Sequence, residues 1–465
     1  MASVALAPTE LGTEKIGKLL KMYAVPGIIA QTAASLYNMV DSIYIGHIPG
    51  VGSAAISGLA VTFPLMNLAT AMGTLVGVGA TTLISVLLGQ KNYDTARRVL
   101  SNVLSLNLII GALFSGVTLA FLDPILRFFG ASDVTLPFAR DYMLIILIGN
   151  VFTHLYFGFN GLIRASGHPK TAMGLTLFTV ISNAILDPVF IFVFEMGIRG
   201  AALATVICQV AALVYTMKFF LDKKNLLHFP KPMFQIDWRI AGQSLAIGLG
   251  PFLMNSAACL VALFINQQLG KYGGDLAIGA YGIVNRLTML FIMVCMGFNQ
   301  GLQPIAGYNY GARQYHRVKE VFVLTAKWEI LVTSLCFLMA ELIPGLAVSL
   351  FTNDPEMIEM ASKALRIMCA GTALVGFGIT TSTFFQCLGM VSKSIFLSLS
   401  RQLIFLLPLI YSLPMWFQEK GVWMSFPIAD TLSVVVSLVF VLRLFKKFDK
   451  LKDGQDAGAL GSAIK

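Results

Sequence analysis

Apolar stretches of about twenty or more residues recur along almost the whole chain, and this recurrence limits its fold most strongly. A helix of that length crosses the ~30 Å hydrocarbon core of a bilayer. Only 12% of the residues are charged and the mean hydropathy is +0.78, whereas soluble domains contain about 25% charged residues. We therefore exclude a water-soluble protein. We predict spans near residues 17–47, 57–88, 99–121, 141–163, 171–194, 200–221, 241–268, 279–306, 321–345, 363–388, 394–414 and 422–443.

A block of the sequence repeats itself without gaps 222 residues later. Gly52-Ser53-Ala54-Ala55-Ile56 aligns with Gly274-Asp275-Leu276-Ala277-Ile278. Gly89 and Tyr93 align with Gly311 and Tyr315, and Gly167 aligns with Gly389. An internal repeat in so apolar a chain is typical of a secondary transporter, whose substrate site lies between two related halves.

The distribution of basic residues predicts the orientation. If the N-terminus is cytoplasmic, 24 of the 33 Lys and Arg residues fall on the cytoplasmic side and seven on the outer side. Twelve helices with both termini inside therefore obey the positive-inside rule. The net charge of +10 then reports orientation and does not indicate a nucleic-acid partner.

The fold class that we predict is an all-α polytopic membrane protein with two pseudo-symmetric six-helix halves around a central cleft. The longest polar interruption, residues 222–239, is the expected cytoplasmic linker. Residues 1–221 then form the N-terminal half and residues 240–445 the C-terminal half. Residues 446–465 are expected to be a disordered cytoplasmic tail, because they are polar and rich in glycine. Six helices per half would relate the halves by an axis along the membrane normal.

Carboxylates at membrane depth are costly and therefore mark candidate functional sites. Asp41 lies late in the first span, and Asp187 lies late in the fifth. Asn183 is four residues before Asp187 and so shares its helix face. Thr205 begins the sixth span at a similar expected depth. These four residues are suited to bind one H+ or Na+. The competing interpretation of each acid is a helix end in water.

The second half has fewer candidates. Its charged residues at depth are Arg286, Glu329 and Asp430, and we expect Arg286 and Asp430 to form a structural ion pair. Glu329 is expected at the membrane interface, because Lys327 is close to it. Pro26 shares a helix with Asp41 and is the candidate hinge. The six cysteines are scattered singly through the spans, so neither disulfides nor a zinc site is expected. No removable signal peptide is expected either.

The motifs together resemble the multidrug and toxic compound extrusion family, called MATE. The resemblance covers residues 16–445 and rests on several segments. These are Pro26, Asn38-Met39-Val40-Asp41, Gly89-Gln90, Arg164-Ala165-Ser166-Gly167-His168-Pro169-Lys170, Asn183-x-x-x-Asp187-Pro188, Gly197-x-x-Gly200-Ala201-Ala202-x-Ala204-Thr205, Gln300-x-x-Gln303-Pro304 and Gly307-Tyr308-Asn309-Tyr310-Gly311. The pattern is most similar to the DinF type and to the MepA-like bacterial group.

The resemblance implies export of amphipathic, often cationic compounds in exchange for H+ or Na+, by a rocking motion of the halves. It implies coupling through Asp41, Asn183, Asp187 and Thr205, and no second-half acids on spans 7 and 10 are present to add to them. The predicted substrate cavity consists of Tyr37, Asn38, Asn160, Met173, Arg286 and Gln300. We expect no cofactor beyond the coupling ion, no metal other than Na+ at the coupling residues, and no nucleic-acid partner. We expect a monomer in a bacterial cytoplasmic membrane, and H+ in preference to Na+.

Two other classes remain as alternatives. A flippase of the same superfamily, which moves a lipid-linked oligosaccharide, would need a basic cavity, and Arg286 is the one deep arginine that we expect. An intramembrane enzyme would need an Asp-rich metal motif or a nucleophile–base pair, and the sequence contains no DDxxD, HExxH or GxSxG. We therefore predict that the protein is not an enzyme.

Overall fold

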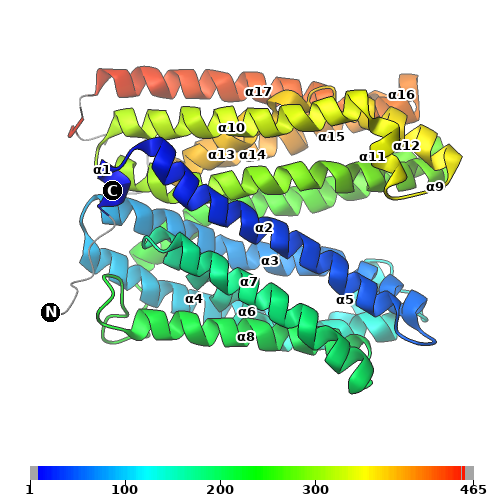
Figure 1. The fold of residues 1–465 in the computed structure, drawn as a ribbon, viewed down its shortest axis with the longest axis horizontal. Coiled ribbons are helices and arrows are strands. Elements are labelled where there is room, and N and C mark those ends of the chain that lie inside the picture. The colour runs from blue at the N-terminus through cyan, green and yellow to red at the C-terminus, as the bar shows by residue number, and fades with distance from the viewer. Residues whose placement is uncertain (1–8, 452, 456–465) are drawn as a thin grey trace. The chain divides into compact units, whose positions relative to one another are not determined.

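The computed structural model describes residues 9–451 and 453–455, except for the side chains of Asn38, Met39, Ser53 and Asp275. These residues form helices and loops and contain no strand, so the predicted all-α class is confirmed (Figure 1). The first helices are α1 (Glu10–Thr13), α2 (Ile16–Gly46), α3 (Gly52–Gly89), α4 (Tyr93–Ala120), α5 (Leu122–Phe128), α6 (Leu136–Ala165), α7 (Pro169–Pro188), the π-helix η1 (Val189–Val193) and α8 (Ile198–Leu221). Then follow α9 (Trp238–Gly311), α10 (Tyr315–Leu342), α11 (Pro344–Ser349), α12 (Pro355–Cys369), the 3-10 helix η2 (Thr372–Leu374), α13 (Val375–Cys387), α14 (Val391–Leu399), the π-helix η3 (Ser400–Leu406), α15 (Leu407–Ser412), α16 (Pro414–Phe417) and α17 (Glu419–Lys450).

The helices account for twelve spans within the described residues. Ten helical segments are long and apolar enough to cross a membrane, and a pair bent by 48°, Pro355–Cys369 with Thr372–Cys387, forms one more. The 31-residue helix α2 is about 46 Å long at ~1.5 Å per residue and forms the first span. Within α9, Gly274 has φ 68° and ψ −165°, which separates the seventh and eighth spans. A glycine is suited to that turn because it has no Cβ.

The chain divides into two compact units. Unit 1 contains α1 and Ile29–Phe252, and unit 2 contains Glu14–Ile28 and the described chain from Leu253. The boundaries therefore lie inside α2 and α9, just after Pro26 and just after Pro251. The N-terminal part of α2 packs within unit 2, and the N-terminal part of α9 packs within unit 1.

In unit 1, α6 packs against α3, α4 and α8. Small residues bring these helices close, as in other membrane helix pairs. A Cβ on Gly77 of α3 would lie 3.0 Å from the Cα of Gly158 of α6. The start of α9 approaches α3 even more closely, since a Cβ on Gly248 would lie 1.8 Å from the carbonyl oxygen of Leu75. These backbone contacts leave no room for larger side chains.

In unit 2, the same kind of contact holds the start of α2. A Cβ on Gly297 of α9 would lie 2.5 Å from the Cα of Ile28, and one on Gly301 would lie 2.8 Å from the backbone nitrogen of Ala24. Gly297 and Gly301 are the repeat equivalents of Leu75 and Gly79, and a Cβ on Gly79 would lie 1.8 Å from the carbonyl oxygen of Ser244. Equivalent positions therefore receive an incoming helix in both copies of the repeat.

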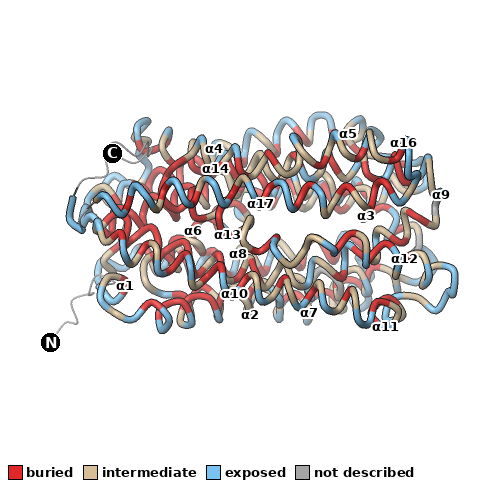
Figure 2. Tube along the Cα trace, turned by 90° about the horizontal axis from the view of Figure 1, so that it is seen from above, coloured by how far each residue is buried: buried red, intermediate tan, exposed pale blue. Residues whose placement is uncertain are grey.

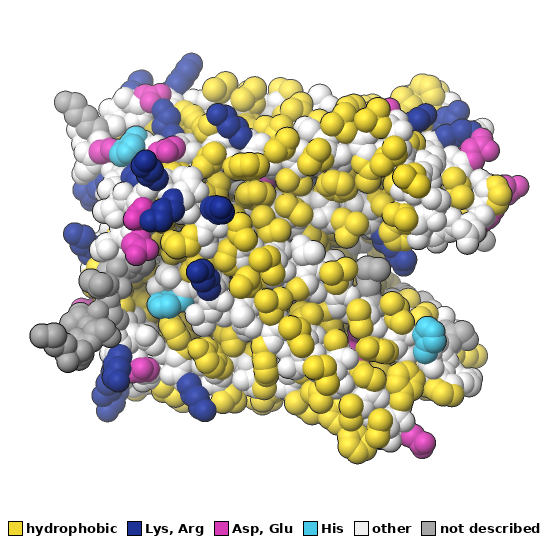
Figure 3. Space-filling view, viewed as in Figure 1, with side chains coloured by type: hydrophobic (Ala, Val, Ile, Leu, Met, Phe, Trp, Pro, Cys, Tyr) yellow, Lys and Arg dark blue, Asp and Glu magenta, His cyan; other side chains and the backbone are white. Residues whose placement is uncertain are grey.

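Each unit has an apolar core and an apolar outer surface. Buried residues follow the inner faces of the helices (Figure 2). Large hydrophobic side chains such as Leu113, Ile185 and Val435 are nevertheless exposed on the helix sides. In the space-filling view, hydrophobic side chains cover the flanks of the helices, and many Lys and Arg side chains lie at one end (Figure 3). This surface fits a hydrocarbon environment.

The C-terminal segment is more ordered than the sequence predicts. Helix α17 continues to Lys450, so the predicted disorder is wrong for residues 446–450. Asp453 also binds unit 2, because its Oδ1 accepts a hydrogen bond from the backbone nitrogen of Tyr315 at 2.9 Å. The hydroxyl of Tyr315 donates to the carbonyl oxygen of Gln455 at 2.7 Å. Residues 456–465 of the predicted tail lie outside the described residues.

Candidate ion-coupling site

Three helices of unit 1 meet at the hydroxyl of Thr205. This hydroxyl donates to the carbonyl oxygen of Ala201 at 3.1 Å, so its oxygen accepts from its other partners. The amide of Asn183 donates to it at 3.3 Å, and the Tyr37 hydroxyl lies 2.8 Å away. Because Thr205 has one hydrogen, Tyr37 is the donor. The network joins α2, α7 and α8.

Both predicted carboxylates are buried beside this network. Asp41 on α2 is 5% exposed and Asp187 on α7 is 0% exposed. Each lies close enough to Tyr37 to act on it electrostatically, and Asp41 acts on Asp187 in the same way. The sequence prediction that Asp41, Asn183, Asp187 and Thr205 share one depth agrees with this geometry.

The free atoms of the cluster are hydrogen-bond acceptors. Among the described residues, Oδ1 of Asp41, both carboxylate oxygens of Asp187 and Oδ1 of Asn183 are buried and have no hydrogen-bond partner. No salt bridge to either acid is present in the described part of the chain. Four buried oxygens without a donor form a site that a proton or a small cation stabilises.

The local backbone places Asp187 at a helix irregularity. Pro188 follows it, and since proline has no N–H, the regular hydrogen-bond ladder cannot continue through it. The chain forms the π-helix η1 at Val189–Val193, and π-turns within helices occur often at functional sites.

Sequence analysis missed two neighbours of the acids. Tyr142 of α6 is 2% exposed and interacts electrostatically with Asp41, Asp187 and Tyr37. Cys208 of α8, one turn after Thr205, interacts with Asp187. A tyrosine and a cysteine within apolar spans give little signal in one sequence, so the tertiary fold alone identifies them.

The other predicted residues of unit 1 occupy different positions. Asn160 of α6 is buried, and its amide donates to the carbonyl oxygen of Ala172 and to the Tyr156 hydroxyl, each at 3.2 Å. It therefore joins α6 to α7 nearer the start of α7 than Asn183. Met173 is half-buried on α7. The side chain of Asn38 lies outside the described residues.

Three predicted residues lie in unit 2. Pro26 is buried in α2, and Gln300 of α9 lies against the next residue, since a Cβ on Gly27 would be 3.2 Å from the Gln300 Cβ. Arg286 of α9 is exposed. The expected ion pair between Arg286 and Asp430 is wrong, because Asp430 accepts a hydrogen bond at 2.6 Å from Nε of Arg401 instead. Arg401 lies on η3, packed against α17.

The expected interfacial position of Glu329 is also wrong. Its side chain on α10 is 0% exposed, while Lys327 and Trp328 beside it are exposed. The three residues point in different directions around the helix, so a basic neighbour in the sequence did not indicate depth.

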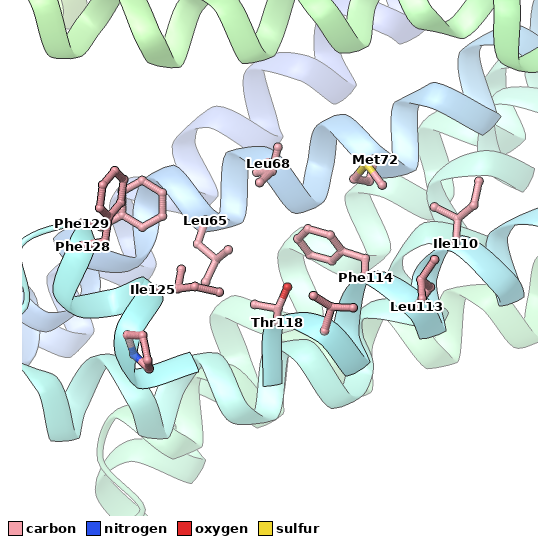
Figure 4. A pocket seen from close by; sticks show the side chains of 12 residues that line it. Leu65, Leu68, Met72, Ile110, Leu113, Phe114, Thr118, Ile125, Phe128 and Phe129 are labelled. Carbon is pink, nitrogen blue, oxygen red and sulfur yellow. The ribbon is translucent and has the colours of Figure 1, made fainter. Parts of the chain in front are cut away.

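One pocket of about 640 Å³ lies in unit 1 between α3, α4 and α5 (Figure 4). Its lining is apolar except for Thr118, and it contains none of the predicted site residues. Its rim includes Leu113 and Phe128, which are 65% and 82% exposed, so it opens on the apolar flank of the unit. Among the described residues, no three His, Cys, Asp or Glu side chains group as a metal site.

Twelve spans, an apolar surface and a buried site of unpaired carboxylates define a multi-pass membrane transporter. The sequence model of the MatE family matches residues 26–189 and 251–412. The chain therefore belongs to the MATE family of multidrug efflux transporters. The two matched stretches correspond to the two copies of the internal repeat.

Curated relatives and solved structures agree with this assignment. The chain is 28% identical over 427 residues to the multidrug export protein MepA of Staphylococcus aureus (strain MSSA476), covering 92% of this chain and 94% of the relative. It is 35% identical to the MATE multidrug transporter DinF-BH, solved in complex with a drug, with a TM-score of 0.86 and coverage of 95% and 98%. A MATE in the bent conformation has a TM-score of 0.90 at 23% identity, with coverage of 96% and 99%.

Proposed function

We propose that this protein is a secondary antiporter that exports amphipathic or cationic compounds in exchange for H+. The observation that carries the proposal is the acceptor-only cluster of Asp41, Asp187 and Asn183. Buried carboxylates without a positive partner need a proton or a cation. When the site opens to water on one face of the membrane, the ion leaves, and the change in charge becomes linked to the position of the helices.

A proton fits the cluster better than Na+ does. Sodium in a protein site needs about five or six oxygen ligands, by analogy with other hard cations. The cluster offers four free buried oxygens, and the Thr205 oxygen already accepts two hydrogen bonds. One proton shared between Asp41 and Asp187 needs no further ligand.

The cargo class rests on the relatives. MepA is named as a multidrug export protein, and the DinF-BH structure contains a bound drug. A lipid-linked oligosaccharide is less favoured, because Arg401 is paired with Asp430 and Arg286 is exposed. We propose a monomer in a bacterial cytoplasmic membrane, with both termini cytoplasmic and no cofactor besides the coupling ion.

The test uses purified protein in liposomes that contain the fluorescent organic cation ethidium. An imposed pH gradient and an imposed Na+ gradient are applied separately to wild type, Asp41→Asn and Asp187→Asn. We expect dye movement with the pH gradient in wild type and its loss in both variants.

The control is Asp94→Asn, since the side chain of Asp94 is 87% exposed. This variant should transport as the wild type does. Transport driven by Na+ alone would contradict proton coupling, and undiminished transport in both site variants would contradict coupling through this cluster.

A further inference from the structure

Unit 2 contains a second buried carboxylate with no partner. Both side-chain oxygens of Glu329 are buried and have no hydrogen-bond partner within the described chain. The backbone of α13 closes over it, because a Cβ on Gly376 would lie 2.6 Å from the carbonyl carbon of Glu329. Water therefore has no access to this carboxylate in the packing seen here.

Two polar side chains from neighbouring helices act on Glu329. They are Asn299 of α9 and Thr380 of α13. Asn299 is 5% exposed, and neither its oxygen nor its nitrogen has a hydrogen-bond partner among the described residues. The Thr380 hydroxyl donates to the carbonyl oxygen of Gly376 at 2.9 Å, so toward Glu329 it offers an oxygen. Asn299 is thus the available donor and acceptor.

No positive charge neutralises Glu329 within the described part of unit 2. Lys327 is exposed, and Arg401 binds Asp430. On the helices packed around Glu329, the titratable side chain that acts on it is Cys295 of α9. The carboxyl group must therefore find its neutralising partner outside the protein's own charges. The exposed acids and bases of α12 are Glu356, Glu359, Lys363 and Arg366.

The internal repeat supports a functional origin for this polar position. Glu329 aligns with Asn107 of α4, which is 0% exposed and has two unpartnered amide atoms among the described residues. Thr380 aligns with Gly158, and a Cβ on Gly158 would lie 3.0 Å from Nδ2 of Asn107. Both copies bury a polar side chain here, but only the second copy has one that can exchange a proton.

We propose that Glu329, with Asn299 as its hydrogen-bond partner, is a second proton-binding site within unit 2. The carboxyl group holds its proton while α9, α10 and α13 are packed as seen here. It releases the proton to water when these helices separate. The proposal extends the proton coupling proposed above to a second site, but the binding of this proton does not depend on transport.

The test is infrared difference spectroscopy of the purified full chain in lipid nanodiscs between high and low pH. A carboxylic acid C=O stretch reports protonated Glu or Asp and is absent for Gln and Asn. We expect Glu329→Gln to remove one component of this signal, and Asp41→Asn with Asp187→Asn to remove a different one. An unchanged difference spectrum in Glu329→Gln would overturn the proposal.

Asn299→Ser supplies an independent readout. If Asn299 is the partner, this variant moves the pH midpoint of the Glu329 component, whereas Asn285→Ser, at an exposed position of α9, leaves it in place. An unmoved midpoint in Asn299→Ser would contradict the assigned partner, also if Glu329→Gln failed to fold. A midpoint that Na+ shifts and K+ does not would overturn a proton site in favour of a sodium site.

The two proposals fail separately. If the Glu329 component is present but dye transport ignores the pH gradient, the proposed antiport is wrong and the second site stands. If transport follows the pH gradient and Glu329→Gln leaves the spectrum unchanged, the second site is wrong and the antiport stands.

Discussion

Nε of Arg401 donates a hydrogen bond to Oδ1 of Asp430 at 2.6 Å, and the Asp430 side chain is only 4% exposed. In unit 1, by contrast, Asp41 and Asp187 have no basic partner among the described residues. The two units therefore treat their buried acids differently. One acid of unit 2 is neutralised by the protein itself, and the acids of unit 1 are left for an ion to neutralise.

Arg401→Met should destabilise the protein strongly. The substitution leaves Asp430 buried without a partner, which typically costs about 3–5 kcal/mol. Lys363→Met is the control, because it breaks an ion pair with Glu359 whose side chains are 60% and 69% exposed, worth about 0–1 kcal/mol. Thermal unfolding in detergent compares the two variants. Equal losses would show that the Arg401–Asp430 pair is not structural.

Asp187→Asn should retain or raise thermal stability while it abolishes gradient-driven transport. The amide removes a buried charge that has no partner, and sites built for function commonly reduce stability. Thermal unfolding at neutral pH and dye transport are measured on the same preparation. A variant that loses both stability and transport would instead indicate a structural role for Asp187.

Thr205→Val should cost more stability than Tyr37→Phe. The valine leaves the Tyr37 hydroxyl and the Asn183 amide without their acceptor, at about 1–3 kcal/mol for each buried group. Phenylalanine removes one donor and leaves the Thr205 oxygen with Asn183. A double-mutant cycle on unfolding should give a coupling of about 1 kcal/mol between Tyr37 and Thr205. Strictly additive effects would contradict the hydrogen bond.

Gly248→Ala should be poorly tolerated, whereas Gly242→Ala on the same helix should be neutral or stabilising. A Cβ on Gly248 would lie 1.8 Å from the carbonyl oxygen of Leu75, and nothing lies within 4 Å of one on Gly242. Alanine is favoured over glycine in a helix by about 1 kcal/mol where space allows. Yield of folded protein and the unfolding temperature measure the difference. Similar behaviour of both variants would argue against the close contact of α3 and α9.

Asp453→Ala should lower stability by about 1 kcal/mol, the usual value of a helix N-cap. Asp453 accepts from the first residue of α10, whose preceding residue Gln314 provides no side-chain cap. Asp453→Asn keeps an acceptor and should restore most of the loss. Thermal unfolding of the full chain distinguishes the variants, and equal effects of Ala and Asn would exclude a capping role.

The sequence alone determined the number and type of spans, the repeat and the first-half acids. Apolar length is a local property of the chain, and Asp41, Asn183, Asp187 and Thr205 stand out because charged and polar groups at depth are rare. Tyr142 carries no such signal, and neither does Cys208, so sequence reasoning did not find them.

Only the tertiary structure decided which charges pair and which are buried. Arg401, and not Arg286, reaches Asp430, and Glu329 faces the protein interior although Lys327 and Trp328 beside it are exposed. Successive helical residues point about 100° apart, so depth in the sequence says nothing about direction. Pairing and burial depend on which helix lies opposite, and the close backbone contacts of Gly77, Gly248 and Gly376 fix those neighbours in space.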